Sequence, residues 1–401
     1  MRLDEYLETV SEQIRYTKIR STVTEELKNH ILDQAEAYEA CGAFPEEAME
    51  RAVREMGDPV ETGVSLDRIH RPQMNWGIVI SIGLISILNI GLFYIADLIA
   101  DAYSWQRQAS FIFAGFLFML LVYRLDYSFL GKFGWKPAAI FLGMITVSLL
   151  LFNIPINGTH RWFEIGGIWV SVPEAMYLYI PLFGTALYSF RGDGYNVLLK
   201  VAPLILFPCA FVWITPNITN AGILFVSLMC LFLFAIWKDW YQISKKLILA
   251  ISISGILLMP FAFFGYVYFF GEEYQLARLQ AFFDPAALGD YIVNIAQNMR
   301  VSSSLIGSSE RSVYYLLNGP TTDFLTDYIL VAMCSIYGTL FTVFMIAGLL
   351  FITMKIFKIS ITQKNQLGMI VGMGCGLAFF MKISASILIN LQLIPYFSIS
   401  C

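Results

Sequence analysis

Residues 77–99 read GIVISIGLISILNIGLFYIADLI, an apolar run of 23 residues that contains a single carboxylate, Asp97. As an α-helix this run would extend roughly 35 Å, which is enough to cross the hydrocarbon core of a bilayer. The stretch is therefore predicted to be a membrane-spanning helix.

Eight further apolar runs of similar character follow along the chain. They lie near residues 108–124, 137–154, 172–190, 196–215, 219–237, 246–270, 327–352 and 367–390. About nine spans predict an all-α fold, a polytopic membrane helix bundle, over residues 73–401. The composition agrees, because only 14% of the residues are charged, whereas soluble domains average about a quarter. No segment gathers a basic patch, so nucleic acid is not an expected partner.

Residues 1–72 differ from the rest of the chain in charge. They hold 9 Lys/Arg and 16 Asp/Glu, a net charge of −7, while residues 73–401 hold 17 and 14, a net charge of +3. Apolar residues recur at three- and four-residue spacing from Leu3, Val23 and Ala43, which predicts three short amphipathic helices. No apolar leader precedes them, so no cleavable signal peptide is expected. The sequence predicts a small, acidic, cytoplasmic helical domain ahead of the membrane bundle.

The distribution of Lys and Arg between the loops predicts the orientation of the bundle. With the acidic domain in the cytoplasm, ten basic residues fall on the inner side: Arg124, Lys132, Lys136, Arg191, Lys238, Lys245, Lys246, Lys355, Lys358 and Lys364. The outer loops hold five, none of them lysine: Arg107, Arg161, Arg278, Arg300 and Arg311. We therefore expect a multi-pass plasma-membrane protein with a cytoplasmic N-terminus and with the loops at 155–171 and 271–326 on the outer face.

The first outer loop ends in Val172-Pro-Glu-Ala, which places Glu174 at a helix N-terminus. The helix dipole favours a carboxylate there, so helix capping explains Glu174 as well as a functional role does. Arg161 and Trp162 suit an interfacial anchor, with Trp at the headgroup level and Arg on phosphate. They equally suit a pyrophosphate clamp, because the guanidinium fork matches phosphate oxygens.

Lys382 lies midway along the last apolar run. An ammonium at this depth costs roughly 3 kcal/mol or more unless it is paired or hydrated. Two readings follow: contact with a lipid phosphate or an acidic group in a central cavity, or burial against carbonyls near Ser384 and Ser386. The six cysteines show no metal-binding spacing and the three histidines are scattered, so a His- or Cys-based metal site is not expected.

The motifs of both outer loops resemble the SEDS family of FtsW, RodA and SpoVE. They are Gly158-x-x-Arg-Trp with Gly166 and Pro173-Glu174, Arg278-Leu-x-x-Phe-x-Asp-Pro with Leu288-Gly and Tyr291, Thr326-Asp-Tyr-Ile with Gly338, Asn390-Leu-Gln-Leu-Ile-Pro, and Arg107-Gln108. The resemblance covers about residues 75–401, with the motifs in matching order. The N-terminal segment, with Glu26-Leu-x-x-His-Ile-x-Asp, is similar to the helical prefix domain found ahead of some permeases. A solvated helical cap is the alternative for that segment.

The resemblance implies ten helices in the bacterial cytoplasmic membrane and a glycosyltransferase that polymerises lipid II at the outer face, in division, elongation or sporulation. It implies an undecaprenyl-pyrophosphate-linked glycan as substrate and a class B penicillin-binding protein as partner. Asp290 and Asp284 are then candidates for the catalytic carboxylate, as general base or as ligand of a divalent cation, Mg²⁺ or Mn²⁺. The candidate substrate-binding residues are Arg161, Trp162, Glu174, Arg278, Tyr291, Asp327 and Lys382.

The sequence also departs from the family pattern. The second Asp-Pro, which carries the family's catalytic Asp, is absent, so Asp284 matches an earlier Asp and Asp290 is the nearest replacement. Tyr177 stands where the family has Lys. The sequence ends at Cys401 before a tenth helix, which predicts a C-terminally truncated chain. Two alternatives to an active polymerase stay open: an inactive relative that scaffolds or regulates a transpeptidase, and a flippase for lipid-linked precursors.

Overall fold

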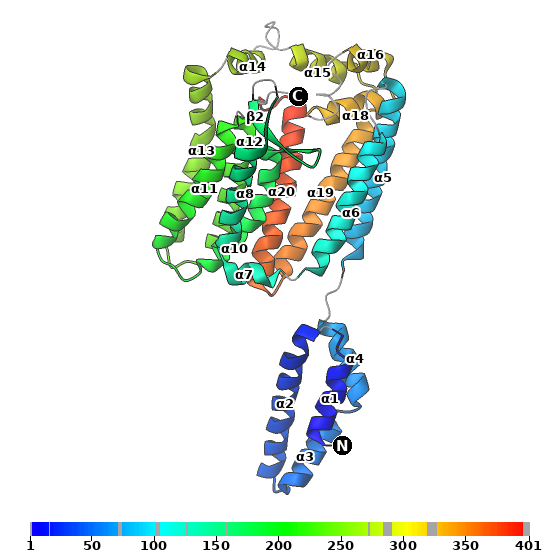
Figure 1. The fold of residues 1–401 in the computed structure, drawn as a ribbon, viewed down its shortest axis with the longest axis vertical. Coiled ribbons are helices and arrows are strands. Elements are labelled where there is room, and N and C mark those ends of the chain that lie inside the picture. Colours follow the sequence, from blue (N-terminus) through cyan, green and yellow to red (C-terminus); the bar gives the residue numbers. More distant parts are fainter. Residues whose placement is uncertain are drawn as a thin grey trace. The chain divides into compact units, whose positions relative to one another are not determined.

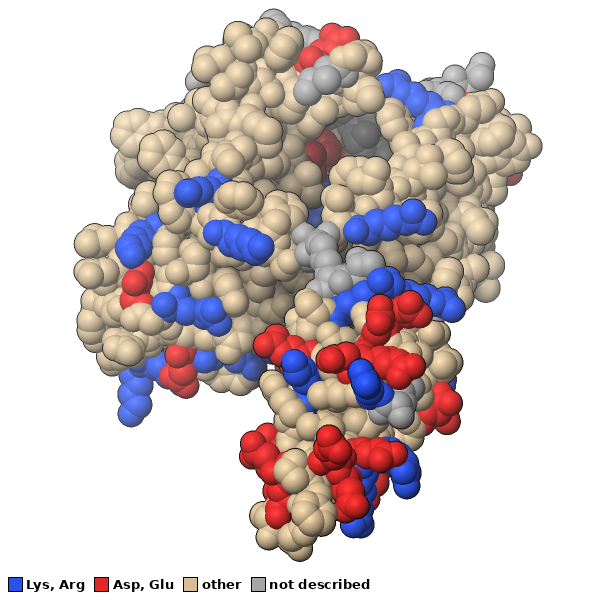
Figure 2. Space-filling view, turned by 60° about the horizontal axis from the view of Figure 1, so that its bottom comes forward, with Lys and Arg blue, Asp and Glu red and all other residues tan. Residues whose placement is uncertain are grey.

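The computed structural model describes residues 2–15, 17–70, 74–100, 105–125, 127–156, 159–215, 217–271, 273–283, 291–318 and 327–395. The chain divides into two compact units, Met1–Gly77 and Ile78–Cys401 (Figure 1). Charged side chains crowd the surface of the first unit, whereas the second is largely uncharged (Figure 2).

Four helices form the N-terminal unit: α1 (Leu3–Gln13), α2 (Thr17–Ala40), α3 (Pro45–Glu55) and α4 (Pro59–His70). The prediction of three helices was wrong because it omitted α4, which begins after Asp58. The Asp58 carboxylate accepts hydrogen bonds from the main-chain N–H groups of Val60 and Glu61, at 2.7 and 3.0 Å, and so pairs donors that a first helical turn leaves unsatisfied. The unit has its own buried core, which includes Tyr6, Val10, Ile14, Ile31 and Ala52.

The second unit is the predicted membrane helix bundle. Seven helices of the described chain are long and apolar enough to cross a membrane. They are α5 (Trp76–Ala100), α6 (Trp105–Arg124), α11 (Asn196–Ile214), α12 (Ile218–Trp237), α13 (Lys245–Phe270), α19 (Thr339–Thr362) and α20 (Gln366–Asn390). Many Leu, Ile and Phe side chains on them are exposed, and an apolar exterior of this extent is typical of a surface that contacts lipid.

Two of the nine predicted spans are shorter helical segments. The first is α8 (Lys136–Phe152), of 17 residues, which follows the short helix α7 (Ser128–Phe133). The second is built from α9 (Val172–Ala175), a 3-10 turn η1 (Met176–Leu178) and α10 (Tyr179–Ser189). The polytopic bundle is confirmed, whereas the count of nine spans stays a prediction.

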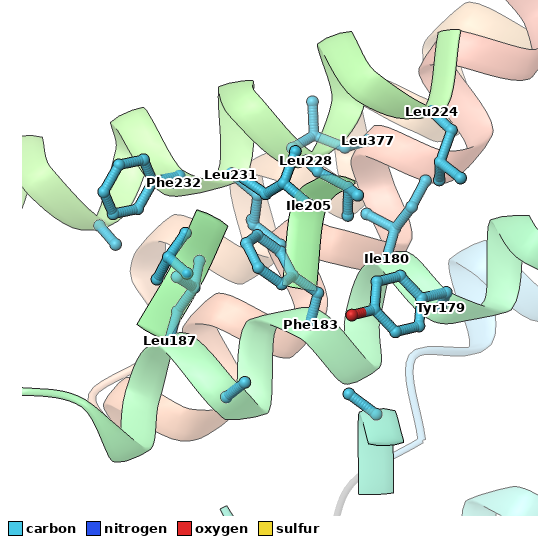
Figure 3. Close-up of a cluster of buried hydrophobic side chains, with 14 of the residues drawn as sticks. Tyr179, Ile180, Phe183, Leu187, Ile205, Leu224, Leu228, Leu231, Phe232 and Leu377 are labelled. Atoms are coloured by element: carbon cyan, nitrogen blue, oxygen red, sulfur yellow. The ribbon is translucent and has the colours of Figure 1, made fainter. Parts of the chain in front are cut away.

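Helix α10 is buried along most of its length and forms the centre of the bundle. Its side chains Ile180, Phe183 and Leu187 belong to one apolar cluster with Leu228 of α12 (Figure 3). Helix α20 packs against α10 on another side, where a Cβ on Gly374 would lie only 2.7 Å from the Cα atom of Pro181. This close approach brings the middle of α20 next to the segment that begins with α9.

The outer loop predicted at 155–171 contains a small antiparallel sheet that the all-α prediction omitted. Its strands are β1 (Asn153–Ile156), β2 (Thr159–Ile165) and β3 (Ile168–Ser171), in the order β1-β2-β3. Gly166 and Gly167 connect β2 and β3 with φ angles of 59° and 81°. A two-residue hairpin turn with two positive φ angles favours glycine at both positions.

The apolar run at 327–352 was predicted as one continuous span, and this prediction was wrong. The helix breaks at Gly338 into α18 (Ile329–Tyr337) and α19, which runs on to Thr362. Gly338 has φ 89° and ψ 164°, a conformation essentially confined to glycine. A Cβ there would lie 2.8 Å from the Cα atom of Ile306, because the main chain of residues 304–307 is hydrogen-bonded across the break.

The described residues of the polar segment after α13 include the helices α14 (Glu273–Phe283), α15 (Tyr291–Ser302) and α16 (Glu310–Asn318). Figure 1 shows them at the same end of the membrane unit as β2, opposite α7. Helices α15, α16 and α18 share a buried cluster that includes Met299, Leu316 and Val331. These helices therefore cover one end of the bundle as a packed layer.

Candidate functional site

An ion pair between Glu174 and Lys382 lies in the membrane unit. The Lys382 ammonium donates a hydrogen bond to the Glu174 carboxylate, and the two side chains are 51% and 45% exposed. Glu174 comes from α9 and Lys382 from α20, which α10 holds together. The predicted cost of a lysine in this span is thus offset by a carboxylate, and their exposure leaves the pair accessible to water or a ligand. The alternative of burial against carbonyls does not fit a side chain that is half exposed.

Tyr177 lies beside this ion pair. Its ring centroid is 5.3 Å from the Lys382 ammonium, within the range of a cation–π interaction. Its hydroxyl donates to Oδ1 of Asn220 on α12, at 3.1 Å. From the sequence, Tyr177 was singled out only as a departure from the family pattern, and no role was predicted for Asn220. The sequence did hold one indication of this contact: Asn220 is a polar residue near the start of an apolar run, where a polar side chain needs a partner.

Arg161 and Trp162 lie on β2. The Arg161 side chain is 7% exposed, and its guanidinium carbon lies 5.4 Å from the centroid of the Trp162 ring. The indole N–H of Trp162 is buried and has no acceptor among the described residues. The interfacial-anchor and pyrophosphate-clamp readings of this pair both stay predictions.

Asn390, the last residue of α20, joins that helix to α18. Its amide oxygen accepts from the main-chain N–H groups of Leu330 and Val331, each at 3.1 Å. Its amide nitrogen donates to the carbonyls of Asp327 and Ser386, at 3.0 and 2.8 Å. Every hydrogen-bonding position of the amide is used. Asp327 is thereby fixed at the start of α18, and Asn390 has a structural role that was not predicted from the sequence.

The same end of α20 also holds α15. The Arg300 guanidinium donates to the carbonyl of Leu391 at 2.8 Å, and the Gln392 amide donates to the carbonyl of Val293 at 2.9 Å. Helix α15 is therefore anchored to the residues that directly follow α20, the helix that carries Lys382.

The remaining predicted residues belong to the segment of the chain between α13 and α18. Arg278 belongs to α14 and Tyr291 begins α15. Asp284 and Asp290, the two candidates for the catalytic carboxylate, lie outside the described residues.

Two cavities flank α20. One, here called the α5–α20 cavity, has a volume of about 320 Å³ and is lined by residues of α5, α18, α19 and α20, including Lys382. The other, here called the α12–α20 cavity, has a volume of about 240 Å³ and is lined by residues of α12, α13 and α20. Figure 2 shows the membrane unit hollowed, with acidic and basic side chains inside the hollow.

A divalent cation does not fit the described part of the site. No group of three His, Cys, Asp or Glu side chains comes together among the residues described. The Glu174 carboxylate contacts an ammonium, which would repel Mg²⁺ or Mn²⁺ from the same oxygen atoms. The divalent cation was predicted at Asp284 or Asp290, which lie outside the described residues, so a metal ion at those carboxylates stays a prediction.

Comparisons with known proteins agree with the bundle. The chain is 25% identical over 255 residues to a Legionella pneumophila protein named probable peptidoglycan glycosyltransferase FtsW, and the match covers 59% of this chain. The chain spans 58% of that relative, a little over half its length.

Two solved structures share the fold. A chain from work described as structural coordination of polymerization and crosslinking by a peptidoglycan synthase complex has a TM-score of 0.60 and 16% identity, over 81% of this chain and 90% of that one. The Thermus thermophilus rod shape determining protein RodA has a TM-score of 0.54 and 14% identity, over 79% and 85%. A family model described as cell cycle protein, that of FtsW, RodA and SpoVE, matches residues 72–400. The chain therefore belongs to the FtsW/RodA/SpoVE family of cell cycle proteins and is a multi-pass membrane protein.

Proposed function

We propose that this chain is a peptidoglycan glycosyltransferase that polymerises lipid II at the outer face of the bacterial cytoplasmic membrane, in division, elongation or sporulation. The observation that carries the proposal is the half-exposed Glu174–Lys382 ion pair in an otherwise apolar bundle. Charged side chains inside a membrane protein mark the path of a polar or charged substrate. Family membership and the relative named as a glycosyltransferase give further support.

The reaction joins an acceptor sugar hydroxyl to the anomeric carbon of a donor glycan. Asp290 or Asp284 takes the hydroxyl proton as general base, a C–O bond forms, and the bond from the anomeric carbon to the pyrophosphate oxygen breaks. The pyrophosphate leaves with its negative charge, which Lys382, Arg161 and Arg278 would stabilise. Trp162, Glu174, Tyr291 and Asp327 would position the glycan.

The same proposal includes an orientation and a partner. The cytoplasmic N-terminus follows from the distribution of Lys and Arg between the loops, so that α14, α15 and α16 face outward. A class B penicillin-binding protein, which would cross-link the strands, is the proposed partner. The resemblance to a chain from a peptidoglycan synthase complex supports this partner.

The test is polymer formation by the purified full chain from lipid II, with and without a class B penicillin-binding protein, read on a gel. We expect glycan strands from the parent chain and none from Asp290→Ala. Asp239→Ala, which removes an exposed carboxylate paired with Lys245, is the matched control and should polymerise normally. Polymer from the Asp284→Ala, Asp290→Ala double variant would exclude both residues as the base.

A second candidate function is that of an inactive scaffold for a transpeptidase. The observation in its favour is the sequence at 284–291, which lacks the second Asp-Pro of the family. A full chain that binds the penicillin-binding protein and raises its transpeptidase activity, yet yields no polymer, would support this function over the first.

A further inference from the structure

A groove lies between α1 and α3 of the N-terminal unit. It has a volume of about 690 Å³ and is lined by residues from the start of α1 and from α3. Three apolar residues line it: Leu3 and Met49, which are partly buried, and Val53, which is buried. We call it the α1–α3 groove. It contains none of the residues assigned to glycan polymerisation, so an inference about it does not rest on the proposed function.

The charged residues of the groove are mostly acidic. Glu5, Glu46 and Glu50 line it together with one basic residue, Arg2. Glu46 makes no hydrogen bond or ion pair with another described residue. Glu50 pairs with Arg54 at 3.2 Å, but both side chains are more than half exposed, so this pair holds the carboxylate only weakly. The groove therefore carries an excess of negative charge that attracts a basic partner.

Phe44 adds an exposed aromatic ring beside the groove. It directly precedes Pro45, which belongs to the groove lining, and it is 75% exposed. Charged side chains crowd the rest of this surface (Figure 2). An exposed aromatic residue next to an apolar groove is typical of a surface that binds another protein.

The shape of the groove indicates what kind of segment fits it. Met49 and Val53 are four positions apart and therefore lie on one face of α3, so they form an apolar strip along that helix. An amphipathic helix places its apolar face in a groove of this kind. We propose that the α1–α3 groove binds a basic amphipathic helix of another protein, on the same side of the membrane as the N-terminal unit.

The proposed helix would place its apolar side chains on the apolar strip and on Phe44. Its Lys or Arg side chains would lie beside the three carboxylates of the groove. The same carboxylates would repel a nucleic acid or an anionic membrane surface. A basic protein segment is therefore the partner that matches both the charge and the apolar strip.

The test measures binding of a fluorescent 18-residue peptide to the full chain in phosphatidylcholine nanodiscs, by fluorescence anisotropy with empty nanodiscs as background. The peptide is an amphipathic helix with leucines on one face and lysines on both flanks. One control peptide has the same composition in scrambled order, and a second has glutamate in place of every lysine. Both controls should bind at least about tenfold more weakly, and added salt should weaken binding of the first peptide.

Two double substitutions locate the charge that the peptide meets. Glu46→Gln with Glu50→Gln should weaken peptide binding about fivefold. Glu25→Gln with Glu26→Gln removes the same charge from exposed positions of α2 outside the groove and should weaken binding less than about twofold. Equal weakening by the two double variants would show attraction to the net charge of the unit alone and would overturn the groove as the site.

A pair of exposed apolar residues tests the aromatic contact. Phe44→Ser should weaken peptide binding several-fold, whereas Ile69→Ser in α4, where the side chain is 72% exposed, should leave it unchanged. All the substituted side chains are exposed, so the variants should unfold at the temperature of the parent chain. Equal binding of the scrambled peptide, or no binding of the amphipathic peptide to the parent chain, would overturn the inference.

Discussion

The side-chain amide of Asn390 donates to the main-chain carbonyl of Asp327 at 3.0 Å. The same amide accepts from two N–H groups in the first turn of α18, so the end of α20 and the start of α18 are held as one body. Lys382 lies about 12 Å earlier along α20. The helix that supplies the ammonium thus also positions Asp327, just before α18 begins.

Asn390→Leu should release the start of α18. The substitution removes four hydrogen bonds and takes from the main-chain N–H of Leu330 the acceptor that it uses, at a cost of about 2–4 kcal/mol. Hydrogen exchange should accelerate in peptides covering residues 328–333 more than elsewhere. Asn318→Leu, at the exposed end of α16, is the control and should change exchange at 328–333 little. If hydrogen exchange at residues 328–333 is equally slow in the parent and the Asn390→Leu chains, Asn390 does not cap α18.

Removing either member of the Glu174–Lys382 pair should destabilise the bundle, and removing both should cost less than the sum. We expect a coupling of about 1 kcal/mol from a double-mutant cycle of Glu174→Gln and Lys382→Met, because the pair is half exposed. Denaturant unfolding in detergent measures it. Strictly additive effects would show that the pair contributes nothing to stability.

Gly338→Ala should be among the most destabilising single substitutions in the bundle. Its φ of 89° and the Cα atom of Ile306 leave no acceptable position for a Cβ, and we expect a loss of about 2–4 kcal/mol. Gly255→Ala in α13 is the matched control, because a Cβ there meets nothing within 4 Å. That variant should be neutral or slightly stabilising, and thermal unfolding separates the two.

The N-terminal unit should lose stability in acid through Glu55. The Tyr38 hydroxyl hydrogen bond, with smaller contributions from Arg51 and Gln34, lowers the pKa of Glu55 below its ordinary value of 4.5. Since the folded pKa is the lower one, the stabilisation is present above the unfolded pKa and is lost as pH falls through the folded pKa. Tyr38→Phe should raise the pKa of Glu55 and start acid unfolding at a higher pH. A carbon-detected titration of Glu55 measures the shift, and Gln34→Leu should change it less.

The apolar runs were enough to locate most of the helices, because a span must satisfy its backbone internally whatever its neighbours are. The break at Gly338 could not be predicted from the apolar run, because a glycine inside such a run is also compatible with a continuous helix. The sequence Gly166-Gly167 is typical of a two-residue hairpin turn. The sheet was still not predicted, because nearly all of the surrounding sequence indicates helices. In the N-terminal unit, Asp58-Pro59 is a typical helix start, yet helix α4, which begins there, was not predicted.

The contacts within the site were harder to predict from the sequence than the fold was. Glu174 and Lys382 were each singled out, yet the two residues are 208 positions apart, so no spacing rule could pair them. Asn390 caps a helix 60 residues earlier in the chain, a contact that only the tertiary fold creates. The sequence shows which polar and charged residues stand in unusual places, whereas the packing of the helices determines which of these residues are in contact.

The late position of α20 in the chain has a consequence for biogenesis. Glu174 and the first turn of α18 are synthesised before their partners Lys382 and Asn390. Until α20 inserts, the carboxylate lacks the Lys382 ammonium and α18 lacks the Asn390 cap. The Glu174–Lys382 pair therefore forms only once α20 has been made, so a ribosome that stalls before α20 would leave a helical bundle without this ion pair.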